Sequence, residues 1–332
     1  MISHLEKHER RKCFMKGLNW GILGLGNIAH EFADNMVQLH PIYAVASRNP
    51  ESAKAFAQQY QAEKAYGSYE ELLNDPKVDI VYVATVNSQH YKCIMACLAH
   101  GKHVLCEKAI WGNYEEMEAA CALAKSKKLL LCEGMTIFHM PIFKEIKKMI
   151  VEGKLGKIKF VEAELGSLKE DDPTNRFFNP DLGGGAMLDI GTYGLSFVTY
   201  FLSGELTGVE HLMSPYPTGV DEMWSISLKT SENEIGSVNL TFRAKLPKRG
   251  IIAGDKAYIT VMNYVRAEKA TLVYPDGKEE VLEVGETSNA LQYEIQDIEE
   301  AVATGNYSLA WMDKTMQVVK LMDELLRAER LQ

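Results

Sequence analysis

Residues 19–30, NWGILGLGNIAH, decide the fold of this chain. The apolar run at their start is typical of a buried strand, and Gly24, Gly26 and Ala29 then form a GxGxxA pattern where a helix would begin. Gly24 permits a tight turn, Gly26 lets the backbone approach a pyrophosphate at the helix N-terminus, and the small Ala29 allows close helix packing. We therefore interpret this segment as a dinucleotide-binding turn rather than a glycine turn that binds no ligand. It contributes five cofactor-binding candidates: Gly24, Gly26, Asn27, Ile28 and Ala29.

Outward from this turn, short apolar runs alternate with longer amphipathic stretches as far as residue 135. This alternation is typical of βα units around a parallel sheet. The predicted strands are NWGIL, IYAVA, DIVYVA, KHVLC and LLLCE, and the predicted helices cover residues 27–39, 50–60, 88–100 and 114–127. The fold class is therefore α/β, with an N-terminal Rossmann domain over residues 17–136.

The pattern changes after Pro141. A helix through Ile150, a strand near 158–165, a glycine-rich loop and a helix at 186–202 precede runs that alternate apolar and polar residues, as strands with one covered face do. These runs are WSISLKT, GSVNLTFRA, KAYITVM and KATLVYP, and helices are predicted at 293–303 and 311–330. We expect residues 137–332 to form an α+β substrate and oligomerisation domain on an open, mostly antiparallel sheet, with the last helix packing back on the first domain.

Composition excludes several classes of protein. The 332 residues suit two domains, and 46% hydrophobic with 24% charged residues is ordinary for globular chains. A net charge of −9 argues against nucleic acid as a partner, and no apolar run has the roughly 18 to 20 residues needed to span a bilayer. Six scattered cysteines and a polar N-terminal extension, residues 1–16, favour a cytoplasmic protein with reduced thiols, with Met15 as an alternative start.

The end of the second predicted strand bears on the choice of cofactor. An acidic residue about 20 positions beyond the glycine turn would bind the ribose 2′-hydroxyl of NAD. Ser47 and Arg48 occupy this place, and they could instead bind a 2′-phosphate. We expect NADP(H) to be preferred, with NAD(H) as the alternative cofactor; a merely solvated Arg48 is the alternative interpretation.

Three further segments carry chemistry: ATVNSQHY at 84–91, GKHVLCEKAI at 101–110 and GGGAMLDIGTYG at 183–194. The first two follow or end predicted strands at the carboxyl edge of the sheet, where ligands of such sheets bind, so Lys108 is directed to the cofactor crevice. Asp189 and Tyr193, four residues apart, would share one face of a helix.

With these segments the chain resembles the glucose–fructose oxidoreductase / inositol dehydrogenase / rhizopine catabolism (Gfo/Idh/MocA) family, closest to its dimeric dihydrodiol dehydrogenase branch. The resemblance covers nearly the whole chain. It implies that Lys108 contacts the nicotinamide ribose and a substrate oxygen, that Asp189 and Tyr193 complete the active site, and that the protein forms a homodimer or higher oligomer through its C-terminal sheet. It adds four cofactor-binding candidates, of which Asn87 could equally be a turn residue and His90 a helix residue: Thr85, Asn87, His90 and Glu107.

Hydride transfer to a carbonyl leaves an oxyanion that needs a proton. Tyr193 is the first choice for its donor, because a nearby ammonium would lower the pKa of the phenol toward the working range. Lys108 would polarise the oxygen and Asp189 would orient Lys108 or a substrate hydroxyl, with Lys108 as the alternative donor. Arg176 could meet a substrate oxygen. The non-catalytic alternatives are that Lys108 is a surface lysine, that Asp189 is a helix carboxylate hydrogen-bonded to backbone donors, and that Tyr193 is a core tyrosine.

One departure from the family concerns Ala109, which stands where proline usually follows the lysine. A non-proline cis peptide costs about 2.5–4 kcal/mol, so we expect a trans bond and a shifted Lys108.

A metal site is rejected. His90, Cys93, Cys97 and His100 share a helix face, but ten helical residues span about 15 Å and cannot converge on one zinc ion.

The sequence therefore predicts an NAD(P)-dependent oxidoreductase acting on CH–OH groups of a sugar, polyol or diol. A non-catalytic NAD(P)-binding sensor and an NAD-dependent glycosidase are the alternatives.

Overall fold

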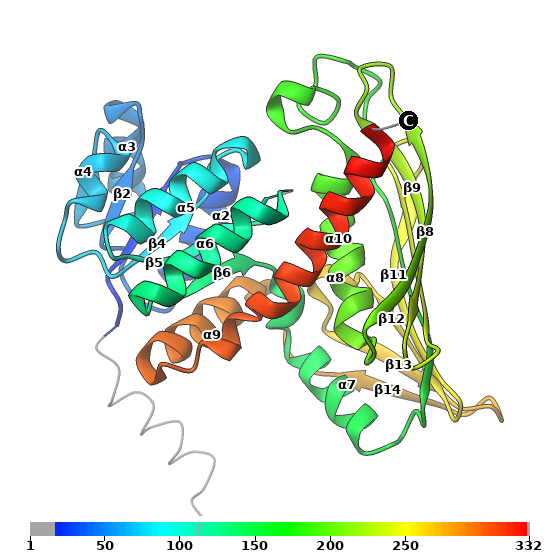
Figure 1. The fold of residues 1–332 in the computed structure, drawn as a ribbon. Helices are drawn as coiled ribbons and strands as arrows, with labels where there is room; N and C mark the ends of the chain where they lie inside the picture. Colours follow the sequence, from blue (N-terminus) through cyan, green and yellow to red (C-terminus); the bar gives the residue numbers. More distant parts are fainter. Residues whose placement is uncertain (1–16, 112, 331–332) are drawn as a thin grey trace, which may run out of the picture.

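The computed structural model describes residues 17–111 and 113–330 (Figure 1). The predicted polar extension 1–16, with Met15, lies outside the described residues. A six-stranded parallel sheet has the order β3-β2-β1-β4-β5-β6. Its strands are β1 (Trp20–Leu23), β2 (Ala44–Ala46), β3 (Lys64–Tyr66), β4 (Ile80–Val83), β5 (His103–Glu107) and β6 (Leu131–Gly134). The order reverses between β1 and β4, which places a ligand crevice beyond their carboxyl ends.

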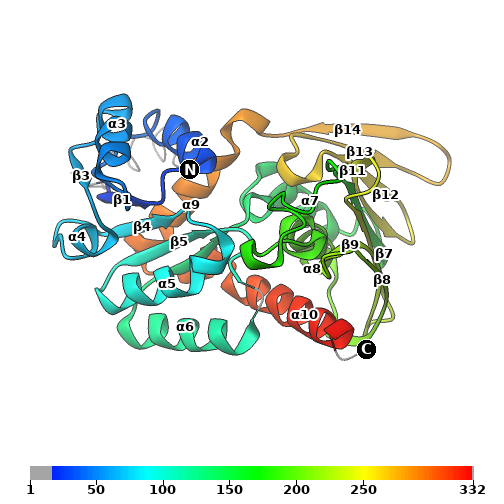
Figure 2. The same cartoon turned by 90° about the horizontal axis from the view of Figure 1, so that it is seen from above.

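Helices cover both faces of this sheet (Figure 2). One face carries α2 (Asn27–Met36), α3 (Pro50–Tyr60) and α9 (Ala290–Thr304). The other carries α4 (Tyr69–Leu73), α5 (His90–Ala99) and α6 (Tyr114–Lys127). The predicted Rossmann fold is confirmed, and a helix from the second half of the chain, α9, completes one of its faces.

The second sheet has eight strands in the order β14-β13-β12-β11-β7-β10-β9-β8, all antiparallel neighbours except the parallel pair β7 and β10. They are β7 (Ile158–Gly166), β8 (Leu206–Pro215), β9 (Asp221–Thr230), β10 (Ile235–Thr241), β11 (Leu246–Gly254), β12 (Tyr258–Met262), β13 (Lys269–Val273) and β14 (Glu279–Glu283). The helices α7 (Pro141–Val151), α8 (Thr192–Phe201) and α10 (Met312–Arg330) all lie on one side of this sheet (Figure 1). The prediction of an open, mostly antiparallel sheet is confirmed.

Several elements differ from the sequence-based expectations. The sequence patterns did not predict β3, α4, β8, β11 and β14, and they predicted a single helix over residues 186–202. The structure has a π-helical turn over Met187–Gly191 that leads into α8. Helix α10 packs on α8 and also on α6, where the backbone N–H of Tyr114 donates to Asp323 Oδ2 at 3.2 Å. Among the described helices, none combines the length and apolar character needed to cross a membrane.

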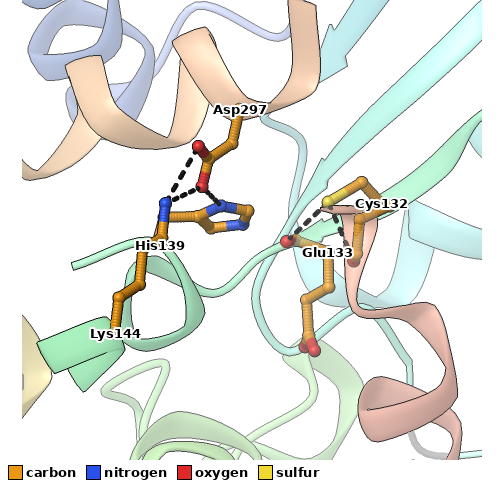
Figure 3. A network of polar contacts seen from close by, with 6 residues as sticks. Cys132, Glu133, His139, Lys144 and Asp297 are labelled. Atoms are coloured by element: carbon orange, nitrogen blue, oxygen red, sulfur yellow. Dashed lines mark hydrogen bonds and ion pairs between the residues drawn. The ribbon is translucent and has the colours of Figure 1, made fainter. Parts of the chain in front are cut away.

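A polar cluster ties α9 to the junction after β6 (Figure 3). Asp297 on α9 lies 2.9 Å from Nδ1 of the fully buried His139 and accepts a hydrogen bond from Lys144 Nζ at 2.7 Å. Burial alone would raise the pKa of Asp297, but His139 and Lys144 outweigh it and lower that pKa. Beside this cluster, the Cys132 thiol donates to the backbone oxygen of Ala310. These contacts fix the second half of the chain against the first sheet.

Candidate active site

A cleft of about 1090 Å³ lies beyond the carboxyl ends of β1, β4 and β5, between the two sheets. Its far wall is formed by the loop between β7 and the π-helical turn, and by the start of α8. The cleft is lined by thirteen of the candidates: Gly24, Gly26, Asn27, Ile28, Ser47, Arg48, Thr85, Asn87, Glu107, Lys108, Arg176, Asp189 and Tyr193. The structure therefore brings together residues that are spread over 170 positions of sequence.

The glycine turn has the shape that a dinucleotide needs. Gly24 has φ +86°, and a Cβ there would lie 2.8 Å from the backbone oxygen of Ala84. Gly26 is the N-cap of α2 and offers no side chain to the first amides of the helix, and a Cβ there would meet no protein atom within 4 Å. The open space and the free helix N-terminus fit a pyrophosphate.

Two predicted cofactor residues lie behind the cleft rather than in it. Ala29 is fully buried between α2 and the sheet. His90 is also fully buried, and its ring nitrogens lie 3.0 Å from the backbone oxygens of Thr85 and Ala109. Burial lowers the pKa of His90. Both residues support the cleft wall, and the side chains packed around them prevent direct contact with a ligand.

Residues that follow β2 form another part of the cleft lining. Arg48 is exposed and lines the cleft, while the Ser47 hydroxyl accepts a hydrogen bond from the backbone N–H of Asn49 at 3.1 Å. The Asn49 side chain in turn caps α3 by accepting from Glu51 N and Ser52 N. A capped helix start therefore holds Arg48 at the mouth of the cleft.

The expectation of a trans peptide after Lys108 is wrong, because the Lys108–Ala109 bond is cis. Hydrogen-bond partners hold the segment on both sides of this bond. The Ala109 carbonyl oxygen lies 3.0 Å from His90 Nδ1, and the N–H of Ile110 donates to Glu133 Oε1 at 2.9 Å. Lys108 lines the cleft, as the family resemblance implies.

The three predicted catalytic side chains meet at one point. Lys108 Nζ donates to the backbone oxygen of Asp189 at 2.9 Å and lies 3.5 Å from its Oδ1. The same ammonium lies over the Tyr193 ring, 4.7 Å from its centroid. Asp189 lies in the π-helical turn and Tyr193 near the start of α8, and the backbone oxygen and carboxylate of Asp189 both face the lysine.

The electrostatics of this group differ in part from expectation. Burial raises the pKa of Tyr193, and the Lys108 ammonium opposes only part of this rise, so the expected net lowering is wrong. Burial disfavours the Lys108 ammonium, but Tyr193, Asp189 and Glu107 together outweigh it and raise its pKa. At neutral pH the arrangement is therefore a protonated phenol beside a cationic lysine.

A group of buried carboxylates beneath the cleft was not foreseen beyond Glu107. Glu107 accepts a short hydrogen bond from the Tyr82 hydroxyl. Glu133 accepts from Ile110 N and Thr315 Oγ1, and burial raises its pKa to about 7. Glu294 on α9 is fully buried, and burial raises its pKa well above the ordinary value. A charged residue within the apolar run LLLCE was the visible signal for Glu133, whereas nothing local marks Glu294.

Comparison with known proteins gives consistent matches over most of the chain. A family model described as an oxidoreductase family with an NAD-binding Rossmann fold matches residues 18–135, and one described as a Gfo/Idh/MocA C-terminal domain matches residues 143–260. A trans-1,2-dihydrobenzene-1,2-diol dehydrogenase from Xenopus laevis is 33% identical over 323 residues, covering 92% of this chain and 96% of the relative.

Solved structures share the architecture. An aldose-aldose oxidoreductase from Caulobacter crescentus, complexed with glycerol, has a TM-score of 0.86 at 24% identity, covering 95% of this chain and 98% of that one. A 3-ketoreductase from Actinomadura kijaniata, in complex with NADP and TDP-benzene, has a TM-score of 0.81 at 24% identity, covering 93% and 96%.

Proposed function

This chain belongs to the Gfo/Idh/MocA family of NAD(P)-binding oxidoreductases, and we propose that it moves a hydride between NADP(H) and a hydroxyl or carbonyl carbon of a sugar, polyol or diol. The bound nicotinamide supplies the hydride acceptor or donor. The related proteins named above act, by their names, on diols, aldoses and keto groups, which supports this substrate class.

Tyr193 handles the proton in this proposal. Its raised pKa keeps the phenol protonated at neutral pH, so it can donate to the oxygen of a carbonyl as that oxygen gains charge. The Lys108 ammonium stabilises the same charge, because its raised pKa keeps it cationic. Asp189 orients the lysine through its backbone oxygen and its carboxylate. The protonated Lys108 ammonium is the alternative proton donor.

The observation that carries the proposal is the meeting of Lys108, Asp189 and Tyr193 at the wall of a cleft that begins at a dinucleotide turn. A sensor without catalysis would have no use for this set. Tyr193→Phe and Lys108→Ala should each lower kcat by about 10²–10⁴-fold while NADP⁺ still binds. Tyr307→Phe is the matched control, because its hydroxyl contacts Lys128 O outside the cleft. Unchanged kcat in both site variants would refute the assignment.

The preference for NADP(H) rests on Arg48, which lines the cleft, and on the absence of an acidic side chain at Ser47. Arginine pairs with phosphate through two parallel hydrogen bonds, which the 2′-hydroxyl of NAD cannot match.

A homodimer is also part of the proposal, through the face of the second sheet that the helices leave open. That face is polar along much of its area, with Glu162, Glu164 and Arg249 paired on it. One cross-strand row is largely apolar: Ile235, Phe160, Ala253, Tyr258 and Val273. A second copy would cover this row. Tyr258→Lys should shift sedimentation equilibrium toward monomer, and a wild-type chain that sediments as monomer would remove the idea.

A further inference from the structure

Three cationic side chains converge on the single carboxylate of Asp189. Lys108 Nζ lies 3.5 Å and Arg176 Nη2 lies 3.9 Å from its Oδ1, and Lys169 Nζ lies 3.7 Å from its Oδ2. These distances are longer than those of good hydrogen bonds, so the donors retain capacity for another acceptor. Even when Glu107, which also acts on Lys108, is counted with Asp189, two carboxylates face three cations, so the group carries an excess of positive charge.

An aromatic ring fixes two of these cations. The Arg176 guanidinium lies 4.2 Å and the Lys169 ammonium 3.7 Å from the centroid of Phe177. Arg176 and Phe177 line the cleft, and 67% of the Arg176 side chain is exposed, whereas Lys169 lies behind them with 17% exposed. Burial lowers the pKa of Lys169. Arg176 and Lys108 lower it further, and Asp189 offsets only part of this decrease. The cations repel one another, and a bound anion would relieve that repulsion.

The cofactor's phosphates do not account for this charge. In the proposed binding mode the glycine turn and Arg48 would bind the phosphates, whereas Lys169 and Arg176 lie beside Asp189, where Tyr193 would contact the reacting oxygen. The positive patch is also not a general property of the surface, because the chain as a whole carries a formal charge of −9. A local positive patch in an acidic protein is suited to drawing in an anionic ligand.

We propose that the substrate carries an anionic group, a carboxylate or a phosphate, which Arg176 binds from the loop before the π-helical turn with Lys169 reinforcing its charge. This inference rests on the proposed hydride transfer and narrows its substrate class to acidic or phosphorylated polyhydroxy compounds. A guanidinium pairs with either anion through two parallel hydrogen bonds.

The test compares matched substrates in steady-state NADP⁺ reduction by the full-length protein. The panel pairs D-glucose with D-glucuronate and D-glucose 6-phosphate, sorbitol with gluconate and sorbitol 6-phosphate, and myo-inositol with its 1-phosphate. We expect kcat/KM to be at least tenfold higher for an anionic member than for its neutral parent, and this ratio to fall as NaCl is raised. The carboxylate and phosphate arms show which anion is preferred.

Variants locate the effect. Arg176→Gln and Lys169→Met should each lower the anionic-to-neutral ratio at least fivefold, with NADP⁺ affinity serving as the measure of folding. Arg327→Gln on α10 and Lys278→Met on the hairpin after β13 are matched controls that should keep the ratio. Turnover of neutral members with no anionic preference, or a preference that survives both site variants, would overturn this inference alone. No turnover of any member would instead overturn the proposed function.

Discussion

The two glycines of the dinucleotide turn should respond in opposite ways to the same substitution. At Gly26 the backbone has φ −82° and ψ −173°, which alanine adopts freely, and a Cβ would touch no protein atom within 4 Å. Gly26→Ala should therefore change the free energy of unfolding by less than about 0.5 kcal/mol. Gly24 has φ +86°, and a Cβ there would lie 2.8 Å from Ala84 O. Gly24→Ala should cost about 2 kcal/mol or more, from the left-handed backbone and the displaced strand end.

Gly26→Ala should weaken cofactor binding although it leaves the free energy of unfolding nearly unchanged. The space beside Gly26 is the approach to the first amides of α2, and a methyl group would hold a pyrophosphate away from them. Each hydrogen bond to a charged acceptor contributes about 1.5–3 kcal/mol, so losing one should raise the dissociation constant of NADPH roughly 10- to 100-fold. Fluorescence titration with NADPH and urea unfolding, on the same preparations, give both quantities.

Two results would refute this reasoning. If Gly26→Ala bound NADPH as tightly as the wild type, the pyrophosphate would not lie over this residue. If it lost affinity and unfolding free energy together, the glycine would be needed for the fold rather than for close approach of a ligand.

Three further predictions concern charge. Arg48→Ala should weaken NADP⁺ binding about tenfold or more and leave NAD⁺ binding nearly unchanged, because the phosphate contact is lost; equal losses for both dinucleotides, by titration, would contradict the preference. Glu133 has a folded pKa of about 7, above its unfolded value, so its protonated form stabilises the fold at low pH and this contribution is lost as pH rises from about 4.5 to 7. Glu133→Gln should remove up to roughly 3 kcal/mol of this pH dependence, and Tm profiles as steep as the wild type's would exclude that role. Asp297→Asn should cost about 2 kcal/mol at pH 7 by weakening the contacts with His139 and Lys144. Because the Asp297 pKa is lowered, the contribution of Asp297 to the free energy of unfolding should vanish as pH falls through that pKa. An Asp297→Asn variant with the wild-type free energy of unfolding at pH 7 would contradict this prediction.

Much of the fold could be predicted because its signals are local. The turn at Gly24 and Gly26, the alternating βα pattern and the strand-end position of Lys108 each depend on a few neighbouring residues. The missed elements lack such signals. β3 and α4 have only three and five residues. The edge strand β8 has a half-buried and an exposed face, but His211 lies on the first and Leu212 on the second, so its sequence shows little alternation.

The site was less predictable where it depends on convergence. Lys169 and Glu294 reach the cleft region from a loop and from α9, and no spacing in the sequence relates them to Lys108. The predicted direction of the Tyr193 pKa shift was wrong for a related reason. The sequence indicates a neighbouring ammonium, but it does not measure how deeply the phenol is buried, and burial is the larger effect.

The position of α9 on the first sheet has a consequence for the order of assembly on the ribosome. The buried Trp20 in β1 donates to Glu299 in α9, 279 residues later, and Ile295, Ile298 and Ala301 fill the same core. The parallel sheet is translated within the first 134 residues, yet the part of one face that α2 and α3 do not cover stays open until residues 290–304 emerge. Nascent chains of intermediate length therefore expose apolar strand surface for most of synthesis, which is when such chains depend on chaperones.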